Sequence, residues 1–361
     1  MNMFRAQISW VFRGRIHAIA AFFATGMWMT ASIGCETPNR ASSSERWSIA
    51  IHGGAGTIEK NSPPEIIALY ERSLQIALQV GRGVLAKNGS ALDACEAVVR
   101  TLEEDPGFNA GVGAAFTADG THELDACIMD GSTLACGAVA GVTTVKSPVM
   151  LARLVMTKTR FVLLSGDGAE LFATEMGVAR VPNSAFDTDK RREMLENWRR
   201  EQSTKPRASI PSSTTKALSY GTVGCVALDT SGNLAAATST GGLTGKRWGR
   251  IGDSPIVGAG TYANNATCAV SCTGTGEQFI RHVVAKSVSD HMELAGQSLD
   301  QSARHLVFKT LKPDDGGLIA IDCVGNISMM YNGDGMFRGC ADSAGRFEVA
   351  IWDQLCTQRP Q

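Results

Sequence analysis

Hydrophobic and polar positions follow two different periods along the chain, which predicts a mixture of helices and strands. Apolar residues recur at roughly helical spacing between positions 67 and 85, after the start Ser62-Pro63-Pro64. Proline suits the first turn of a helix. A second helical pattern follows Ser90, where Asp93 three residues later completes a start that resembles a capping box. We therefore expect two helices here, each with one face against a sheet.

The other apolar runs are short and rich in strand-forming residues, so they predict strands. These runs span residues 47–51, 114–116, 123–129, 135–142, 160–164, 223–229, 234–240, 266–271, 317–322 and 327–331. The runs 223–229 and 234–240 flank the turn Ser231-Gly232-Asn233 and predict a hairpin. Further helices are expected at about 277–288 and 297–310. Sheets with helices on their outer faces predict an α+β fold, built as a four-layer αββα sandwich.

The chain changes character between about residues 187 and 221. A charged stretch from 189 to 201 gives way to a segment rich in serine, threonine and proline at 205–215. This composition predicts a mobile linker, with an ordinary surface loop as the alternative. A loop of this length inside a compact domain favours a functional explanation, and slack around a cleavage point is one.

The first 35 residues have the pattern of an export signal. Basic residues come first, an apolar run spans 18–29, and a stretch of small residues ends at Cys35. The sequence Ser32-Ile33-Gly34-Cys35 is close to a bacterial lipobox, although Ser32 stands where an aliphatic residue is usual. We expect a periplasmic protein with Cys35 as a lipidation site and residues 36–45 as a spacer. Plain export and a retained N-terminal anchor are the alternatives, although the apolar run is shorter than the ~20 residues that span a membrane.

Composition limits the classes of partner. The chain has 361 residues with 44% hydrophobic content, enough for a large core. Lys plus Arg (34) nearly balances Asp plus Glu (35), so no strong field attracts nucleic acid or an acidic membrane. A small-molecule substrate is the expected partner. The ten cysteines include no CxxC pair, which argues against a zinc site and a dense disulfide framework but leaves a single disulfide open.

A threonine in the middle of the chain has the setting of a nucleophile. The sequence Gly221-Thr222-Val223-Gly224 opens a predicted strand directly after the polar stretch. If the bond before Thr222 is cut, its freed α-amino group lies next to its hydroxyl and acts as a general base. An α-amino group titrates at about 7.7–8.0, which suits proton transfer near neutral pH. Taken alone, a Gly-Thr pair is typical of an ordinary strand start.

Further motifs on both sides of Thr222 favour the catalytic interpretation. They are 51–56 (IHGGAG), 108–113 (FNAGVG), 123–126 (ELDA), 238–242 (TSTGG), 249–255 (GRIGDSP), 262–265 (YANN) and 271–277 (SCTGTGE). In this order and spacing the chain resembles the plant-type asparaginase and isoaspartyl peptidase family of N-terminal-nucleophile hydrolases, which also includes glycosylasparaginase. The resemblance covers roughly residues 46 to 345.

The resemblance implies a self-cleaving hydrolase that has Thr222 as both nucleophile and base. Cleavage between Gly221 and Thr222 would give an α subunit of residues 46–221 and a β subunit of residues 222–361, which assemble as a dimer of αβ heterodimers. Hairpin geometry places Thr240 beside Thr222, where it would tune the base. Thr273 and Gly274 match the family's oxyanion hole, one with a hydroxyl and one with a backbone N–H.

The implied substrates are L-asparagine and β-aspartyl (isoaspartyl) dipeptides, from which L-aspartate is released. Arg250 suits a substrate α-carboxylate and Asp253 an α-ammonium group, although the two could instead pair with each other at the surface. By resemblance, Gly276 adds a backbone carbonyl to the ammonium site. Asn109 would lie near the oxyanion water.

No catalytic cofactor is implied, but the family holds a structural sodium ion through main-chain carbonyls. The corresponding residues here are Leu102, Glu103, Asp105, Phe108, Ala110 and Val112. His52 resembles a catalytic histidine. Since the nucleophile brings its own amine, we expect His52 to have a structural role.

Two features bear on the choice among related functions. Lys246-Arg247-Trp248 adds bulk and positive charge on a loop at the mouth of the site, where it could reshape the preference for the leaving group. Gly221 favours the peptidase branch, since glycosylasparaginases usually carry Asp at that position. Glycosylasparaginase activity remains an alternative within the family. An unprocessed amino-acid-binding lipoprotein is the alternative from another class, and it is disfavoured because every proposed catalytic and binding side chain is intact.

Overall fold

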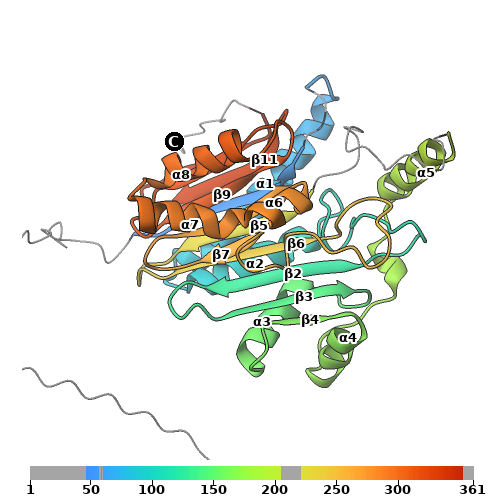
Figure 1. Cartoon of the computed structure of the whole chain (residues 1–361), viewed down its shortest axis with the longest axis horizontal. Helices are drawn as coiled ribbons and strands as arrows, with labels where there is room; N and C mark the ends of the chain where they lie inside the picture. The colour runs from blue at the N-terminus through green and yellow to red at the C-terminus, as the bar shows by residue number, and fades with distance from the viewer. Residues whose placement is uncertain (1–45, 57, 59, 205–220, 353–361) are drawn as a thin grey trace, which may run out of the picture. The chain divides into compact units, whose positions relative to one another are not determined.

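The computed structural model describes residues 46–56, 58, 60–204 and 221–352 (Figure 1). The predicted export signal, Cys35 and the spacer 36–45 lie outside these residues. In the described part, two sheets carry helices on their outer faces, so the prediction of an α+β fold is confirmed. No helix in that part is long and apolar enough to cross a membrane.

The larger sheet has eight strands, and Thr222 immediately precedes one of its central strands. Their order is β12 (Phe347–Ala350), β11 (Met336–Asp342), β1 (Ser48–Ala55), β5 (Val223–Leu228), β6 (Leu234–Thr240), β2 (Leu124–Asp130), β3 (Cys136–Val142) and β4 (Leu163–Ser165). All neighbouring pairs are antiparallel except β3 and β4, which are parallel. The predicted hairpin of residues 223–240 is confirmed as β5 and β6.

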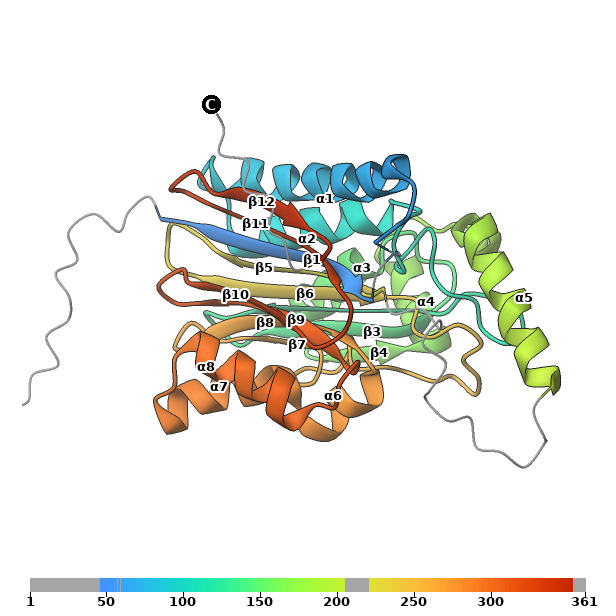
Figure 2. The ribbon, with the colours of Figure 1, turned by 90° about the horizontal axis from the view of Figure 1, so that it is seen from above.

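The smaller sheet lies against the central strands of the larger one. Its order is β10 (Ile327–Tyr331), β9 (Gly316–Asp322), β8 (Cys268–Gly274) and β7 (Thr261–Ala263). Strands β5 and β6 contact β8 and β9, so the two sheets face each other (Figure 2). The predicted strand 327–331 is confirmed as β10, and those near 266–271 and 317–322 are confirmed with shifted ends. Strands β7, β11 and β12 were not predicted.

Helices cover the outer face of each sheet. The helices are α1 (Pro64–Leu85), α2 (Ala91–Glu103), α3 (Pro148–Lys158), α4 (Gly166–Glu175), the 3-10 turn η1 (Asn183–Phe186), α5 (Asp189–Thr204), α6 (Gly276–His282), α7 (Val284–Ala295) and α8 (Leu299–His305), which continues into the π-helical turn η2 (Leu306–Thr310). Helices α1, α2 and α3 pack on the larger sheet, and α7 and α8 pack on the smaller one (Figure 2). The predicted helices after Ser62 and Ser90 are confirmed, and the Ser90 hydroxyl accepts from the Asp93 N–H at 3.0 Å.

Strand β5 is buried on both faces because it separates two hydrophobic cores. Val223, Cys225 and Ala227 point into the core between the larger sheet and α1, α2 and α3. Val226 and Leu228 point into the core between the two sheets. Successive side chains of a strand point to opposite faces, so these five apolar residues alternate between the two cores. This two-sided burial fixes the strand that starts just after Thr222.

The sequence prediction also differs from the structure in other segments. Residues 189–204, expected to belong to a mobile linker, form helix α5; they are rich in strong helix formers, and Leu195 is buried. Residues 114–116 form no strand, because the Ala115 N–H is bound by the side chain of Asn109. The helix expected at about 277–288 is broken at Val283, which is left-handed with φ 47°. Residues 205–220 of the predicted linker lie outside the described residues.

Candidate active site

Thr222 and Thr240 lie side by side at one end of the β5–β6 hairpin. Val223 pairs with Ser239, so the next position along each strand places Thr222 opposite Thr240. The Thr222 hydroxyl donates to Thr240 Oγ1 at 3.1 Å, and both residues are buried. Thr240 Oγ1 also accepts from the Gly242 N–H at 3.0 Å. The orientation of the Thr222 hydroxyl is therefore set by Thr240, whose own hydroxyl is held by the Gly242 N–H.

The peptide bond before Thr222 is held by a backbone donor. The N–H of Asn109 donates to the carbonyl oxygen of Gly221 at 3.1 Å. A Cβ on Gly221 would lie 2.6 Å from Cβ of Asn109, so only glycine fits there without displacement. On the other side, Gly54, with φ 116°, packs its backbone directly against Gly221. A donor aimed at a carbonyl oxygen is what stabilises the developing oxyanion of acyl transfer.

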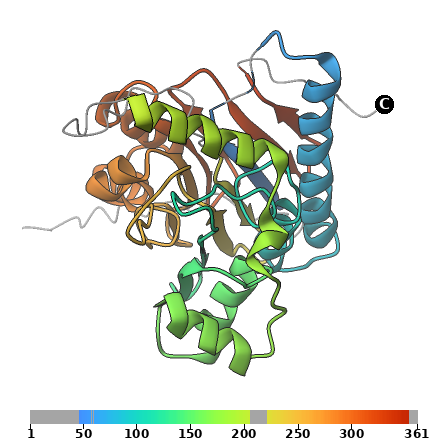
Figure 3. The same ribbon diagram turned by 90° about the vertical axis from the view of Figure 1, so that its right-hand side faces the viewer.

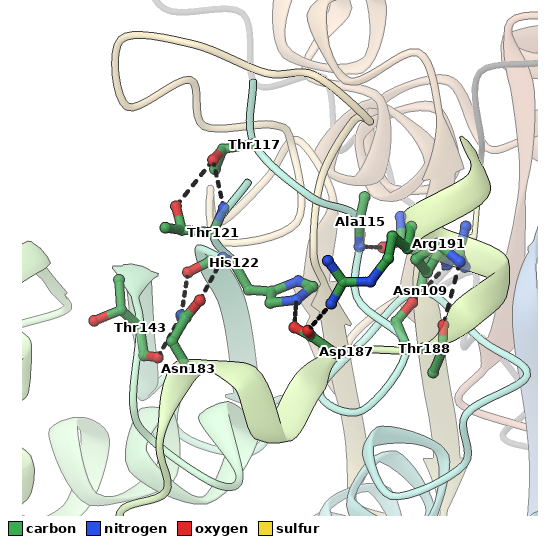
Figure 4. Close-up of polar contacts among 12 residues, drawn as sticks. Asn109, Ala115, Thr117, Thr121, His122, Thr143, Asn183, Asp187, Thr188 and Arg191 are labelled. Carbon is green, nitrogen blue, oxygen red and sulfur yellow. Dashed lines mark hydrogen bonds and ion pairs between the residues drawn. The ribbon is translucent and has the colours of Figure 1, made fainter. Parts of the chain in front are cut away.

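Asn109 itself is fixed by three further hydrogen bonds. Its Oδ1 accepts from the Ala115 N–H at 2.7 Å (Figure 4). Its Nδ2 donates to the Gly242 carbonyl at 2.7 Å. Its backbone carbonyl accepts from the Gly241 N–H at 3.0 Å. Asn109 thus joins its own loop to the turn after β6 and reaches the bond before Thr222. The structure brings this predicted site residue directly to Thr222.

Arg250 is paired with a residue that the sequence did not suggest. Its Nε and Nη2 donate to the two carboxylate oxygens of Glu277 at 2.9 and 3.0 Å. The alternative surface pair with Asp253 is not formed among the described residues. Nη1 of Arg250 is directed toward Gly242 and Gly252, since a Cβ on Gly252 would lie 2.9 Å from it. One edge of the guanidinium is therefore held, and Nη1 lies among residues that line the site.

Asp253 is a buried carboxylate available to a cation. Only 4% of the residue is exposed, and its Oδ2 has no hydrogen-bond partner in the described part of the chain. Burial raises the pKa of Asp253 to about 7, against the smaller opposing effects of a backbone hydrogen bond and of Arg250. An ammonium group placed at Oδ2 would supply the missing partner and lower this pKa.

Gly276, Thr273 and Gly274 border the same region. A Cβ on Gly276 would lie 2.8 Å from Nη2 of Arg250 and 3.0 Å from Oδ1 of Asp253, so its backbone touches both. Thr273 is fully buried, and its Oγ1 accepts from the Ala55 N–H at 2.9 Å, which leaves its own proton to donate. Gly274 ends β8 at φ 151°, pressed against the carbonyl of Asp315.

These residues enclose a cavity of about 10 Å³, roughly the room for one water molecule. Its lining consists of Asn109, Gly221, Thr222, Thr240, Gly242, Leu243, Arg250, Gly252, Asp253, Ser254 and Gly274. Because Gly221 is part of the wall, the uncut chain itself fills space beside Thr222. The cavity is too small for a dipeptide until Gly221 moves.

Comparison with known proteins decides the family. The family model described as asparaginase matches residues 45–351. This chain belongs to that asparaginase family. It is 50% identical to the isoaspartyl peptidase of Salmonella typhimurium over 294 residues, which cover 80% of this chain and 93% of that protein. The isoaspartyl peptidase of Escherichia coli is 49% identical, with 80% and 91% covered, and the probable isoaspartyl peptidase/L-asparaginase 2 of Arabidopsis thaliana is 44% identical, with 85% and 99% covered. The resemblance stated from the motifs is confirmed.

His52 lies next to Thr222 and contacts its backbone. Its Nδ1 is 2.9 Å from the carbonyl oxygen of Thr222, and its Nε2 is 2.9 Å from Oγ of Ser271. Burial lowers the pKa of His52 to about 3, although the hydrogen bond to Thr222 opposes the shift. A neutral imidazole with both nitrogens engaged is not placed to act as the general base, which agrees with the structural role expected for His52.

Arg191 is a site neighbour that the sequence placed in a linker. It comes from α5, lies beside Asn109 (Figure 4), and is only 5% exposed. Its Nε donates to the Gly113 carbonyl at 2.6 Å, and a Cβ on Gly221 would lie 3.5 Å from its Nη2. Burial lowers the pKa of Arg191 to about 10. Helix α5 lies across the end of the sheets (Figure 3) and brings this cation to the bond before Thr222.

Two glycines after Asn109 pack closely against backbone carbonyls of the loop before it. A Cβ on Gly113, with φ 89°, would lie 2.6 Å from the Pro106 oxygen and 2.7 Å from the Phe108 oxygen. Gly111, with φ 51°, packs directly on the carbonyl of Glu103, which also accepts from the Val112 N–H at 2.8 Å. In the described part of the chain, no cluster of His, Cys, Asp or Glu side chains could hold a metal. A cation at this loop would therefore be bound through backbone oxygens.

Proposed function

We propose that this chain cleaves its own Gly221–Thr222 bond and then hydrolyses L-asparagine and β-aspartyl dipeptides, releasing L-aspartate. The names of the three relatives support this substrate class. The observation that carries the proposal is that the Thr222 hydroxyl and the adjacent Gly221 carbonyl are each held by a hydrogen bond. Thr222 Oγ1 is bound to Thr240, and the carbonyl one residue earlier is bound to the Asn109 N–H.

Self-cleavage would begin with attack of Thr222 Oγ1 on the carbonyl carbon of Gly221. The oxygen of Gly221 gains negative charge, which the Asn109 N–H stabilises. The C–N bond breaks as the nitrogen takes the hydroxyl proton, which leaves an ester on Oγ1 and a free α-amine on Thr222. Water then hydrolyses the ester. The products are a subunit that ends at Gly221 and a subunit that begins at Thr222.

In the mature enzyme the freed amine of Thr222 removes the proton from its own hydroxyl. Oγ1 attacks the side-chain amide carbon of the substrate, and the Thr273 hydroxyl and the Gly274 N–H stabilise the oxyanion. The amide C–N bond breaks, and ammonia or an amino acid leaves with the proton. Hydrolysis of the aspartyl ester by water releases L-aspartate and restores Thr222.

The binding side of the site fits a free amino acid end. Nη1 of Arg250 would receive the α-carboxylate, while Glu277 holds the other edge of the guanidinium. Oδ2 of Asp253 would accept from the α-ammonium group, and the Gly276 carbonyl would share it. Opposite charges on the two protein groups suit a zwitterion, which selects for an aspartyl group with a free α-amine and a free α-carboxylate.

A structural sodium ion belongs to this proposal. The carbonyls expected to hold it are those of Leu102, Glu103, Asp105, Phe108, Ala110 and Val112. The loop suits such an ion in its chemistry, because Gly111 and Gly113 pack against the carbonyls of Glu103 and Phe108, and hard cations prefer oxygen ligands. A cation bound there would supply rigidity to the loop that ends at Asn109, and no catalytic step would pass through it.

The remaining features of the proposal concern assembly and location. The layer order of helices, two sheets and helices supports the four-layer αββα sandwich of N-terminal-nucleophile hydrolases. We expect a dimer of αβ heterodimers and export to the periplasm, with Cys35 lipidated; these expectations rest on the family and on residues outside the described structure. In the described part, all eight cysteines are free.

Substrate assays test the proposal. Purified protein is incubated with L-asparagine, with β-aspartyl-leucine and with N4-(N-acetylglucosaminyl)-asparagine, and L-aspartate is measured. The proposal predicts release from the first two substrates and none from Thr222→Ala. Release from the glycosylated substrate alone would favour glycosylasparaginase, and binding without release from any substrate would favour the unprocessed binding protein.

A further inference from the structure

A chain of buried polar side chains runs from the carbonyl of Thr222 to Thr261. His52 contacts Thr222 and Ser271, as described above. Ser271 Oγ is 2.6 Å from Thr238 Oγ1, which is 2.7 Å from Thr261 Oγ1. Thr261 Oγ1 also lies 3.1 Å from the carbonyl oxygen of Ser254, the residue after Asp253. The four linking side chains, those of His52, Ser271, Thr238 and Thr261, are fully buried.

The direction of these hydrogen bonds follows from the carbonyl at the Thr222 end. The carbonyl of Thr222 only accepts, so Nδ1 of His52 must carry the proton. Nε2 of the neutral ring then accepts from the Ser271 hydroxyl. Because Ser271 has one proton, Thr238 donates to Ser271, and Thr261 in turn donates to Thr238. These four donors all point toward Thr222, so the single proton of Thr261 is used on Thr238 and the chain ends at Thr261. Hydrogen bonds aligned in this way strengthen one another.

Gly224 is required for this arrangement. It pairs with His52 across strands β1 and β5. A Cβ on Gly224 would overlap both Nε2 of His52 and Oγ of Ser271, at distances that real carbon atoms do not show. The glycine two residues after the nucleophile therefore leaves the space in which His52 meets Ser271. No proposed catalytic step assigns this glycine a role.

Thr222 needs such an anchor because it lies beyond the paired part of β5. Pairing of β5 with β1 ends at Gly224, and pairing with β6 ends at Val223. After self-cleavage Thr222 would also lose its covalent link to Gly221 and become a chain end, where backbone order is lowest. Its carbonyl is then the backbone group of Thr222 that a side chain still holds. That side chain is His52.

We propose that His52, oriented by Ser271 and Thr238, is the positioning residue that fixes the backbone of Thr222 and hence the direction of its freed α-amine. This inference rests on the proposed function, since it concerns the amine that self-cleavage creates. His52 does not exchange a proton with substrate. It holds the carbonyl of Thr222, and the hydroxyl chain behind it holds the ring of His52 in place.

The test compares two substitutions of His52 that differ in one hydrogen bond. His52→Leu removes the donor to Thr222, whereas His52→Asn places an amide nitrogen near the position of Nδ1. We expect His52→Leu to lower kcat for L-asparagine by about 10–100-fold with KM changed by less than about 3-fold, since orientation of a reacting group is worth that much. His52→Asn should recover most of the loss. In the substrate complex the bound ammonium keeps Asp253 ionised, so the acidic limb of kcat against pH reports the Thr222 amine and should move in His52→Leu.

A second pair of variants covers the case in which His52→Leu does not fold. Ser271→Ala removes one hydroxyl behind His52, and Ser289→Ala removes an equally buried hydroxyl that bonds to Thr267 away from the site. We expect a lower kcat and a moved acidic limb for Ser271→Ala alone. Equal kcat and equal pH profiles in these two variants would overturn the inference. An uncut, inactive wild-type chain would overturn the proposed function instead, so the two failures are distinguishable.

Discussion

The backbone N–H of Asn109 donates a hydrogen bond to the carbonyl oxygen of Gly221, with nitrogen and oxygen 3.1 Å apart. This contact joins the loop after α2 to the peptide bond that precedes Thr222. The same asparagine binds the turn after Thr240 through its side chain. Asn109 therefore fixes the carbonyl of Gly221. Through the turn at Gly242 it also supports Thr240, which binds the hydroxyl of Thr222.

Substitution of Gly221 should disturb the hydrogen bond from the Asn109 N–H while leaving the side chains of the site unchanged. In Gly221→Ala the added Cβ would lie 2.6 Å from Cβ of Asn109, so the carbonyl must shift away from its donor. We expect self-cleavage to slow by about 10–100-fold, measured by the conversion of intact chain on denaturing gels. Gly168→Ala, where a Cβ meets nothing within 4 Å, is the matched control and should cleave at the wild-type rate. Equal rates for both variants would argue against a role for the contact.

The β5–β6 hairpin and the position of Thr240 beside Thr222 could be predicted, because both depend on the local pattern of the sequence. The two runs on either side of Ser231-Gly232-Asn233 set the register of β5 and β6, and that register places Thr240 beside Thr222. The contact of Asn109 with Gly221 joins segments far apart in the chain, and no local pattern encodes it. A motif match placed Asn109 near the site without its donor role.

The α5 region shows why composition alone misled the prediction. Its charged residues indicated a linker, yet Arg191 and Leu195 share one helix face and are buried against the body. Trp198 lies further along the same helix and packs on Gly245, whose φ is 75°. The many charged residues on the exposed face of α5 masked the buried positions in a reading by composition.

The pairing of Arg250 with Glu277 could not be predicted either. Both residues lie in recognised motifs, but only the fold shows that they form a salt bridge.

Loss of Glu277 should weaken substrate binding more than chemistry. Its carboxylate holds Nε and Nη2 of Arg250, so Glu277→Ala frees the guanidinium to turn away from the site. The pair is partly exposed, so we expect a rise in KM for L-asparagine of about 3–10-fold with kcat nearly unchanged. Asp300→Ala, which breaks the exposed pair with Arg304, should leave KM unchanged. A fall in kcat with constant KM in Glu277→Ala would contradict this role.

Asp253 should make the stability of the protein depend on pH. Its folded pKa of about 7 lies above its ordinary value of 3.8, because the buried carboxylate is costly to ionise. Between these values the folded chain binds more protons than the unfolded chain, so this group's contribution to stability falls as pH rises and levels off above about pH 7. Asp253→Asn removes this loss. In thermal unfolding, the melting temperature of Asp253→Asn relative to that of wild type should rise between pH 5 and pH 8. A difference in melting temperature that does not change with pH would contradict the raised pKa.

Trp248 should affect the choice of leaving group without affecting the fold. It is 96% exposed and left-handed at φ 58°, in a turn closed by the hydrogen bond from the Arg250 N–H to the Arg247 carbonyl. A bulky residue in this conformation costs about 1–2 kcal/mol, so Trp248→Gly should raise the melting temperature slightly. We expect kcat/KM for β-aspartyl-phenylalanine to fall about 3–10-fold relative to L-asparagine, since aromatic contact is lost. An unchanged ratio would exclude Trp248 from substrate selection.

The central claim is that Thr222 becomes the N-terminus of a catalytic subunit. The most direct measurement is N-terminal sequencing of the smaller band on a denaturing gel of the purified protein, alongside Thr222→Ala. The account predicts a wild-type band that begins at Thr222, and a variant that remains one uncut chain and releases no L-aspartate from L-asparagine. A wild-type chain that stays intact on long incubation, or an active Thr222→Ala protein, would contradict it.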